Sequence, residues 1–161
     1  LEFRRVLFRS TETANLRSIS SGVLYKDGNA IYKVDSAGSK TKLVDFTETV
    51  LSWCDDGTSL FWTANVSSKG TLYKKPLSSS SSSTSASLGG ATQLYQHPSA
   101  ATSSMIMEYA KDRLIVGDGS ALWAHAGTVS TPDTIYTQNN SSFILGQRNG
   151  SFFARNGLGK I

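Results

Sequence analysis

The sequence predicts an all-β protein, specifically a β-propeller fragment of about three to four four-stranded antiparallel blades, incomplete at both ends. Three observations predict this class. Asp-Gly pairs stand between short apolar runs at 27–28 and 118–119, as in β-hairpins. Aliphatic positions recur at intervals near 40 residues. No segment carries a sustained apolar stripe with a 3.6-residue period, so almost no helix is expected.

The main repeat is marked by an aliphatic residue in a short run, which an aromatic residue follows in its first three members. Its members are Ile31, Leu72, Leu122 and Ile161. The spacings are 41, 50 and 39 residues. A period near 40 with four strands in each unit is typical of propeller blades.

A second aliphatic column follows the first by 12, 22 and 13 positions, at Leu43, Leu94 and Ile135. The middle interval therefore holds about ten extra residues, and residues 78–87 are a Ser-rich run of ten. Polar low-complexity sequence cannot bury enough apolar area to offset its ordering entropy. Residues 78–90 are predicted to be a surface loop inside one repeat; a linker between two domains is the alternative.

Each full repeat contains four short apolar runs separated by turn residues. In the second repeat they lie near 49–53, 59–64, 71–75 and 92–96. In the third they lie near 104–109, 113–117, 121–126 and 134–138. The predicted blades are 11–46, 47–97, 98–138 and a truncated 139–161. One such unit cannot bury both of its faces alone, so neighbouring units must stack; an open sandwich of short strands is the alternative.

The net charge of +4 and the pI of about 9.3 suggest an acidic partner at first sight. Residues 1–10, LEFRRVLFRS, resemble a translated sequencing adapter and are set aside; a short basic arm is the alternative. They carry a net +2, and the remainder has 13 basic and 11 acidic residues. This balance gives no electrostatic case for nucleic acid. No apolar run approaches 18 residues, so no membrane span is expected.

No catalytic, cofactor-binding or metal site is predicted, and no cofactor is expected. His97 and His125 are the two histidines, and neither has a partner at metal-ligand spacing, so each is interpreted as structural or solvated. Cys54 is interpreted as a small core residue, since no histidine is close in sequence. The run 55–57, Asp-Asp-Gly, is interpreted as a turn rather than a carboxylate pair.

Other candidates also have structural interpretations. Lys74 and Lys75 are predicted to lie on a solvated face, and the glycines Gly117 and Gly119 to belong to a hairpin. Asn-x-Ser glycosylation sequons begin at Asn65, Asn139, Asn140 and Asn149. They are relevant only in a eukaryotic secreted protein. The aromatic residues predicted to form the core between blades are Trp53, Trp62, Trp123 and Tyr109.

Residues 50–77 resemble a blade of TolB-type propeller repeats, which read approximately Ser-Trp-Ser-Pro-Asp-Gly, then an apolar strand, then an aliphatic-Tyr strand. The matching pairs are Ser52-Trp53, Asp56-Gly57 and Leu72-Tyr73. Cys54-Asp55 replaces Ser-Pro.

Residues 103–161 resemble more closely the propeller region of minor tail proteins from bacteriophages of actinobacteria. The matching positions are Tyr109, Lys111, Arg113, Leu114, Tyr136, Thr137, Asn140, Phe143, Gly150, Phe152, Phe153 and Ala154. Residues 156–159, Asn-Gly-Leu-Gly, depart from the usual pattern of that family.

This resemblance implies a non-enzymatic module of the phage tail, located in the virion, that contacts other tail proteins or a host-surface glycan or protein. A secreted or periplasmic TolB-like propeller that binds a protein or glycan is the alternative. A fragment of a propeller hydrolase is the third hypothesis, and it expects Asp or Glu to recur on the innermost strand of several blades.

Overall fold

The structure is a computed structural model, and it describes residues 16–46, 49–77, 91–100, 105–110, 112–117, 121–137, 143–148 and 151–156. The first sheet, sheet A, consists of β1 (Leu16–Ile19), β2 (Gly22–Asp27), β3 (Ala30–Val34) and β4 (Lys40–Asp45). Sheet B consists of β5 (Val50–Asp55), β6 (Ser59–Val66), β7 (Lys69–Pro76) and β8 (Thr92–Ala100). Sheet C consists of β9 (Ile106–Ala110), β10 (Arg113–Gly117), β11 (Ala121–His125) and β12 (Asp133–Thr137). Sheet D pairs β13 (Phe143–Arg148) with β14 (Ser151–Asn156).

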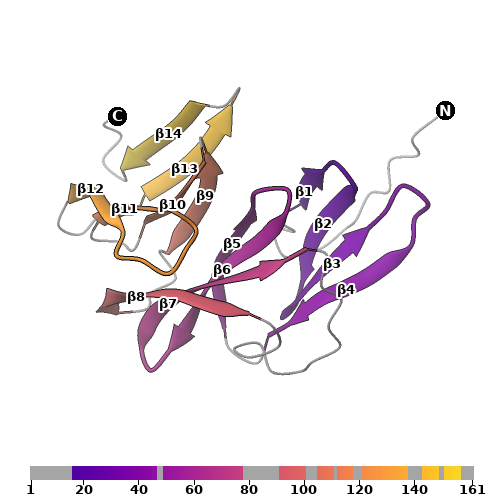
Figure 1. The fold of residues 1–161 in the computed structure, drawn as a ribbon, viewed down its shortest axis with the longest axis horizontal. Coiled ribbons are helices and arrows are strands. Elements are labelled where there is room, and N and C mark those ends of the chain that lie inside the picture. Colours follow the sequence, from indigo (N-terminus) through magenta and orange to yellow (C-terminus); the bar gives the residue numbers. More distant parts are fainter. Residues whose placement is uncertain are drawn as a thin grey trace.

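The described residues form strands, turns and connections without a helix, so the predicted all-β class is confirmed. In sheets A, B and C, each strand pairs antiparallel with the next strand along the chain. The sheets follow one another around an arc, with their first strands toward its interior and their fourth strands toward its rim (Figure 1). Within this arc β5 lies against β9, and β9 lies against β13.

The second aliphatic column marks a β-bulge that recurs in all three four-stranded sheets. In sheet A, Ile31 pairs with Val44 while Tyr32 pairs with Lys42, so Leu43 is the extra residue on the fourth strand. The register skips Leu94 of β8 and Ile135 of β12 in the same way. A bulge bends its strand and redirects its side chains, which lets the consecutive residues Leu43 and Val44 both be buried.

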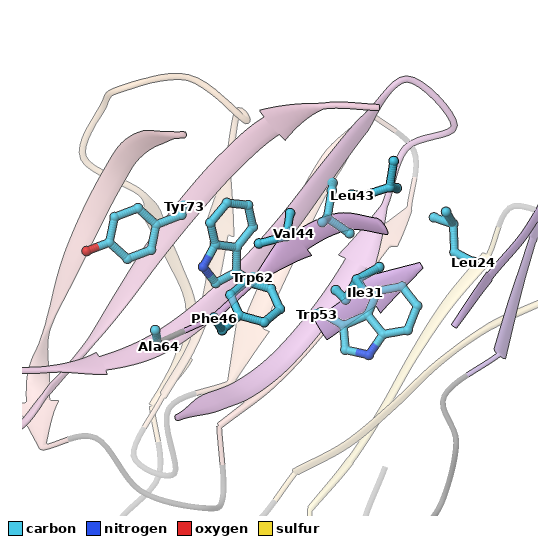
Figure 2. Packing of buried hydrophobic residues seen from close by; sticks show 10 residues of the cluster. Leu24, Ile31, Leu43, Val44, Phe46, Trp53, Trp62, Ala64 and Tyr73 are labelled. Atoms are coloured by element: carbon cyan, nitrogen blue, oxygen red, sulfur yellow. The ribbon is translucent and has the colours of Figure 1, made fainter. Parts of the chain in front are cut away.

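Sheet B is buried on both faces because it lies between sheets A and C. Six consecutive residues of β6, 59–64, are buried. Trp62 faces sheet A, where it packs among Val44, Phe46 and its strand neighbour Tyr73 (Figure 2). Phe61 faces the other way and packs with residues of sheet C. This arrangement meets the expectation that a four-stranded unit needs a neighbour on each face.

The contact between sheets A and B, called the A–B joint, is a cluster centred on tryptophan. Trp53 of β5 lies beside Ile31 of β3 (Figure 2). The contact between sheets B and C, the B–C joint, is instead built from aliphatic and sulfur-containing side chains around Phe61. Its buried members are Cys54, Phe61, Leu72, Leu94, Met105, Met107, Leu114 and Val116.

The hairpin at residues 27–30 differs in detail from the one that the Asp-Gly pair predicts. Asp27 pairs with Ala30 at the end of the strands, so Gly28 and Asn29 form the loop. Gly28 has a φ of 54°, whereas Asn29 is not among the residues with positive φ. A positive φ at the first loop residue alone is the type II′ pattern, whereas an Asp-Gly pair that forms the two loop residues favours type I′.

Several predictions concern residues outside the described ranges. These are the adapter-like segment 1–10, the Ser-rich segment 78–90, and the second Asp-Gly pair at 118–119. Among the described residues, the structure contains no helix with the length and apolar character needed to cross a membrane.

Candidate functional site

The first strands of sheets A, B and C bring a charged cluster together on the inner side of the arc. Arg17 of β1 donates two hydrogen bonds to the carboxylate of Glu108 of β9, with N–O distances of 2.9 and 3.2 Å. The Arg17 guanidinium also lies 5.5 Å from the ring centroid of Trp53 of β5. Asp55, the last residue of β5, is close enough for its charge to act on Arg17.

Strand register explains why Arg17 and Glu108 meet. Arg17 pairs with Leu24, Cys54 with Phe61, and Glu108 with Ile115, so Arg17, Cys54 and Glu108 occupy one position on the first strand of successive sheets. Equivalent positions on the strands nearest the interior of the arc lie at one level. An arginine and a glutamate at that level are close enough to form the ion pair.

Burial and charge act in opposite directions in this cluster. Burial lowers the pKa of Arg17, but the hydrogen bond and charge of Glu108 outweigh burial, and the pKa is raised. Burial raises the pKa of Asp55 despite the Gly57 N–H donor and the Arg17 charge. A fully charged Arg17 therefore holds Glu108 as an ion-pair partner.

The run 55–57 lies at the end of β5, where the chain turns as predicted. The Asp56 carboxylate accepts hydrogen bonds from the backbone N–H groups of Thr58 and Ser59 and from the Thr58 hydroxyl. Asp55 accepts from the Gly57 N–H, and Gly57 has a φ of 83°. These bonds are typical of Asx turns and bind the carboxylates to the loop.

Cys54 is a core residue, as predicted. Its side chain is fully buried in the B–C joint. Burial raises the pKa of the thiol well above 9.0, against the opposing effect of the Arg17 charge. A buried neutral thiol is unsuited to act as a nucleophile.

The two histidines meet, which sequence spacing did not indicate. His97 of β8 and His125 of β11 are both fully buried, and their ring centroids lie 5.2 Å apart. The Tyr95 ring contacts both imidazoles, and Trp123 contacts His97. Burial, and then the charge of His97, lower the pKa of His125 to about 3. Within the described residues, no group of three or more potential metal ligands is present.

The predicted solvated face at Lys74 and Lys75 is wrong. Lys75 is buried, and its ammonium donates a hydrogen bond of 3.0 Å to the Leu43 carbonyl of sheet A. Lys74 lies over the Phe61 ring and donates to the Gly127 carbonyl at 3.2 Å. Adjacent strand residues point to opposite faces, and here each face is covered by a neighbouring sheet.

The other predicted residues occupy structural positions. Trp53 and Trp62 are buried in the A–B joint, and Tyr109 packs on the B–C joint, where its ring stacks on Phe61. Asn65 is exposed near the end of β6, and Gly117 is buried at the end of β10. The positions outside the described residues are Gly119, Asn139, Asn140 and Asn149.

The face of sheet A that points away from sheet B carries a stacked aromatic pair like the one on a buried face of sheet B. Tyr25 and Tyr32 pair across β2 and β3, with stacked rings 5.3 Å apart and an interplanar angle of 20°. Trp62 and Tyr73 are their equivalents in sheet B, stacked at 5.6 Å and 19° and buried against sheet A. The tyrosine pair of sheet A is only half-buried.

Apolar side chains at other equivalent positions of the sheets also differ in their exposure. Leu16 and Val23 of sheet A are 55% and 38% exposed, whereas their equivalents in sheet B, Trp53 and Leu60, are 2% and 1% exposed. In sheet C, the bulge residue Ile135 of β12 is 53% exposed. Its equivalents Leu43 and Leu94 are each 4% exposed.

Comparison with known proteins adds evidence on the fold. No family model matches the sequence, and no curated protein matches it. Among solved structures, the chain is similar to the crystal structure of the computationally designed Ika8 protein, with a TM-score of 0.53 and 12% identity. The alignment covers 88% of this chain and 42% of the designed chain, so this chain spans less than half of that protein. At this identity the likeness concerns the fold alone.

Proposed function

We propose that this chain is part of a β-propeller that serves as a non-enzymatic structural and binding module of a phage tail. One observation supports the propeller: positions that are buried in sheet B are exposed in sheets A and C. The apolar side chains of Leu16 and Val23 in sheet A and of Ile135 in sheet C are those that further strands or sheets would cover. Closing the stack around an axis buries both ends at once.

The assignment to a phage tail is supported by the sequence resemblance that runs from Tyr109 to Ala154. The matching residues are distributed over sheets C and D, on β9, β10, β12, β13 and β14 and the segments between them. In this function the sheets are a rigid frame, and loops or edges bind other tail proteins or a host-surface glycan or protein. The corresponding location is the virion, with a secreted or periplasmic TolB-like propeller as the rival.

A propeller hydrolase is the second candidate, and one observation favours it. Acidic residues stand on the first strands of two adjacent sheets, Asp55 on β5 and Glu108 on β9. The Arg17 ion pair argues for a structural role of Glu108, because both carboxylate oxygens already accept hydrogen bonds from Arg17. The tail module is therefore the preferred function.

The DNA that flanks the coding region tests the tail assignment. Tape-measure and tail-assembly genes beside it would support the proposal, whereas a lipoprotein signal or envelope genes would support the TolB-like rival. The longer reading frame also tests the hydrolase, which requires Asp or Glu at the position of Glu108 in several further repeats. Apolar residues at that position in the further repeats would exclude it.

A further inference from the structure

The B–C joint contains a pair of buried histidines at a place where the A–B joint has none. His125 is the equivalent of Lys75, since both follow the first-column residue of their strand by three positions. His97 is the equivalent of Phe46, since both follow the bulge residue by three positions. In the A–B joint, the Lys75 ammonium donates to the Leu43 carbonyl, and Phe46 packs on Trp62.

The surroundings of His125 favour the neutral imidazole. Both of its ring nitrogens are buried, and neither has a hydrogen-bond partner among the described residues. The ring lies 5.2 Å from the His97 ring and 5.5 Å from the Tyr95 ring. A proton on His125 would place a charge in a buried site next to a second imidazole.

Among the described residues, no acid faces His125 from the strands packed around it. On its own sheet, Leu114 of β10 pairs with it, and Asp133 of β12 pairs with Ala124, whose side chain points to the opposite face. From sheet B, the titratable neighbours are His97 and Tyr95 of β8. Lys74 of β7 adds a positive charge near the end of β11, where it donates to the Gly127 carbonyl.

A metal ion fits this place poorly. Two imidazoles leave a divalent ion short of the four ligands that zinc takes, and the described residues supply no third one nearby. The described residues that face His125 also supply no negative charge to balance a divalent ion. With metal binding disfavoured, uptake of a proton by an imidazole is the reaction that the pair can undergo.

We propose that the His97–His125 pair is an acid-sensitive latch between sheets B and C, which holds β11 against β8 at neutral pH and releases it when an imidazole is protonated. The pKa of His125 is lowered to about 3, so the closed joint does not take up this proton in mild acid. The opened or unfolded chain takes it up below about pH 6.5. The histidine pair therefore stabilises the closed joint fully above about pH 6.5, and this stabilisation is lost as the pH falls from 6.5 toward 3. Over that range the equilibrium constant for opening rises by about tenfold per pH unit for each proton taken up.

The test compares the complete chain with a double variant that copies the A–B joint, His97→Phe with His125→Lys. Urea unfolding is followed at pH 7.5, 6.5 and 5.5, where Asp and Glu stay ionised and Lys stays charged. The unfolding equilibrium constant of the original chain is expected to rise at least about tenfold more than that of the variant between pH 7.5 and 5.5. A Leu72→Val control, in the same joint but without a titratable group, should keep the original pH dependence. Parallel pH profiles for the chain and the double variant would overturn the proposal.

A second measurement needs no variant and keeps the proposal testable if the double variant does not fold. Hydrogen exchange is measured by mass spectrometry at the same pH values, with correction for the intrinsic exchange rate. Peptides from β8 and β11 are expected to lose protection in acid, while peptides from β3 and β4 at the A–B joint keep theirs. Equal loss at both joints, or none at either, would show that the histidines do not form a latch.

Discussion

Arg17 and Glu108 lie at the same position on the first strands of sheets A and C, and their side chains join across sheet B through bonds of 2.9 and 3.2 Å. Their side chains are 24% and 16% exposed. The pair thus connects sheets that are separated by a whole four-stranded unit. Because it is more buried than a surface ion pair, it is expected to stabilise the stack.

Replacing either partner is expected to destabilise the chain. Arg17→Met or Glu108→Gln should each lower the free energy of unfolding by about 2 kcal/mol, because the remaining group loses a charged hydrogen-bond partner while partly buried. Urea unfolding of both single variants and the double variant gives the coupling energy. The double variant should be less destabilised than the sum of the single variants, and strict additivity would mean that the ion pair has no energetic role.

Tyr73 and Tyr32 are a matched pair for measuring the effect of a covering sheet. Tyr73 is 4% exposed and packs in the A–B joint, so Tyr73→Ala should lower the free energy of unfolding by about 3–4 kcal/mol. Tyr32 occupies the equivalent position but is half-buried, with the Lys40 ammonium 3.9 Å from its ring centroid, so Tyr32→Ala should lower it by about 1 kcal/mol. Equal losses would contradict the view that the outer face of sheet A lacks its covering layer.

Cys54 is expected to be protected from thiol reagents in the folded chain. It is the single cysteine, so the rate of reaction with an aromatic disulfide reports on this position alone. Its burial and raised pKa predict a rate at neutral pH that is at least about 10³ lower than in urea. Because the unfolded thiol ionises near pH 8.5 and the folded thiol does not, the free energy of unfolding should also fall as the pH rises above that value. Rapid native labelling would contradict the buried position.

The repeat pattern predicted the strands well because each strand depends on local sequence. The column at Ile31, Leu72 and Leu122 falls on the third strand of each four-stranded sheet, and the intervals between turn residues match the hairpins. The second column also has a physical cause, since Leu43 and Leu94 are bulge residues that fill the next joint.

The cluster on the first strands and the histidine pair were missed because they form between sheets. Arg17 and Glu108 are 91 positions apart, and nothing in the local sequence of either predicts the other. Alignment of the first strands would have shown that Arg17, Cys54 and Glu108 share a position. Lys75 was misassigned for a related reason: a pair of adjacent lysines on a strand usually lies on a solvated face, but a sheet that lies between two others has no such face.

The hairpin between β6 and β7 offers a stabilising change. Ser67 and Ser68 form its two-residue loop between the paired Val66 and Lys69, and their φ angles are 52° and 63°. Positive φ at both loop residues is the type I′ pattern, which favours Asn-Gly and is strained for serine. The double substitution Ser67→Asn with Ser68→Gly should therefore raise the free energy of unfolding by about 1 kcal/mol.

The neighbouring hairpin provides the control for this change, because Asn29 lies in a two-residue loop but has no positive φ. Asn29→Gly relieves no strain and adds flexibility to the unfolded chain, so it should lower the free energy of unfolding by up to about 1 kcal/mol. Urea unfolding of the two variants side by side separates relief of turn strain from a general effect of glycine. If both variants lose stability, the left-handed conformation of Ser67 and Ser68 does not limit the stability of this hairpin.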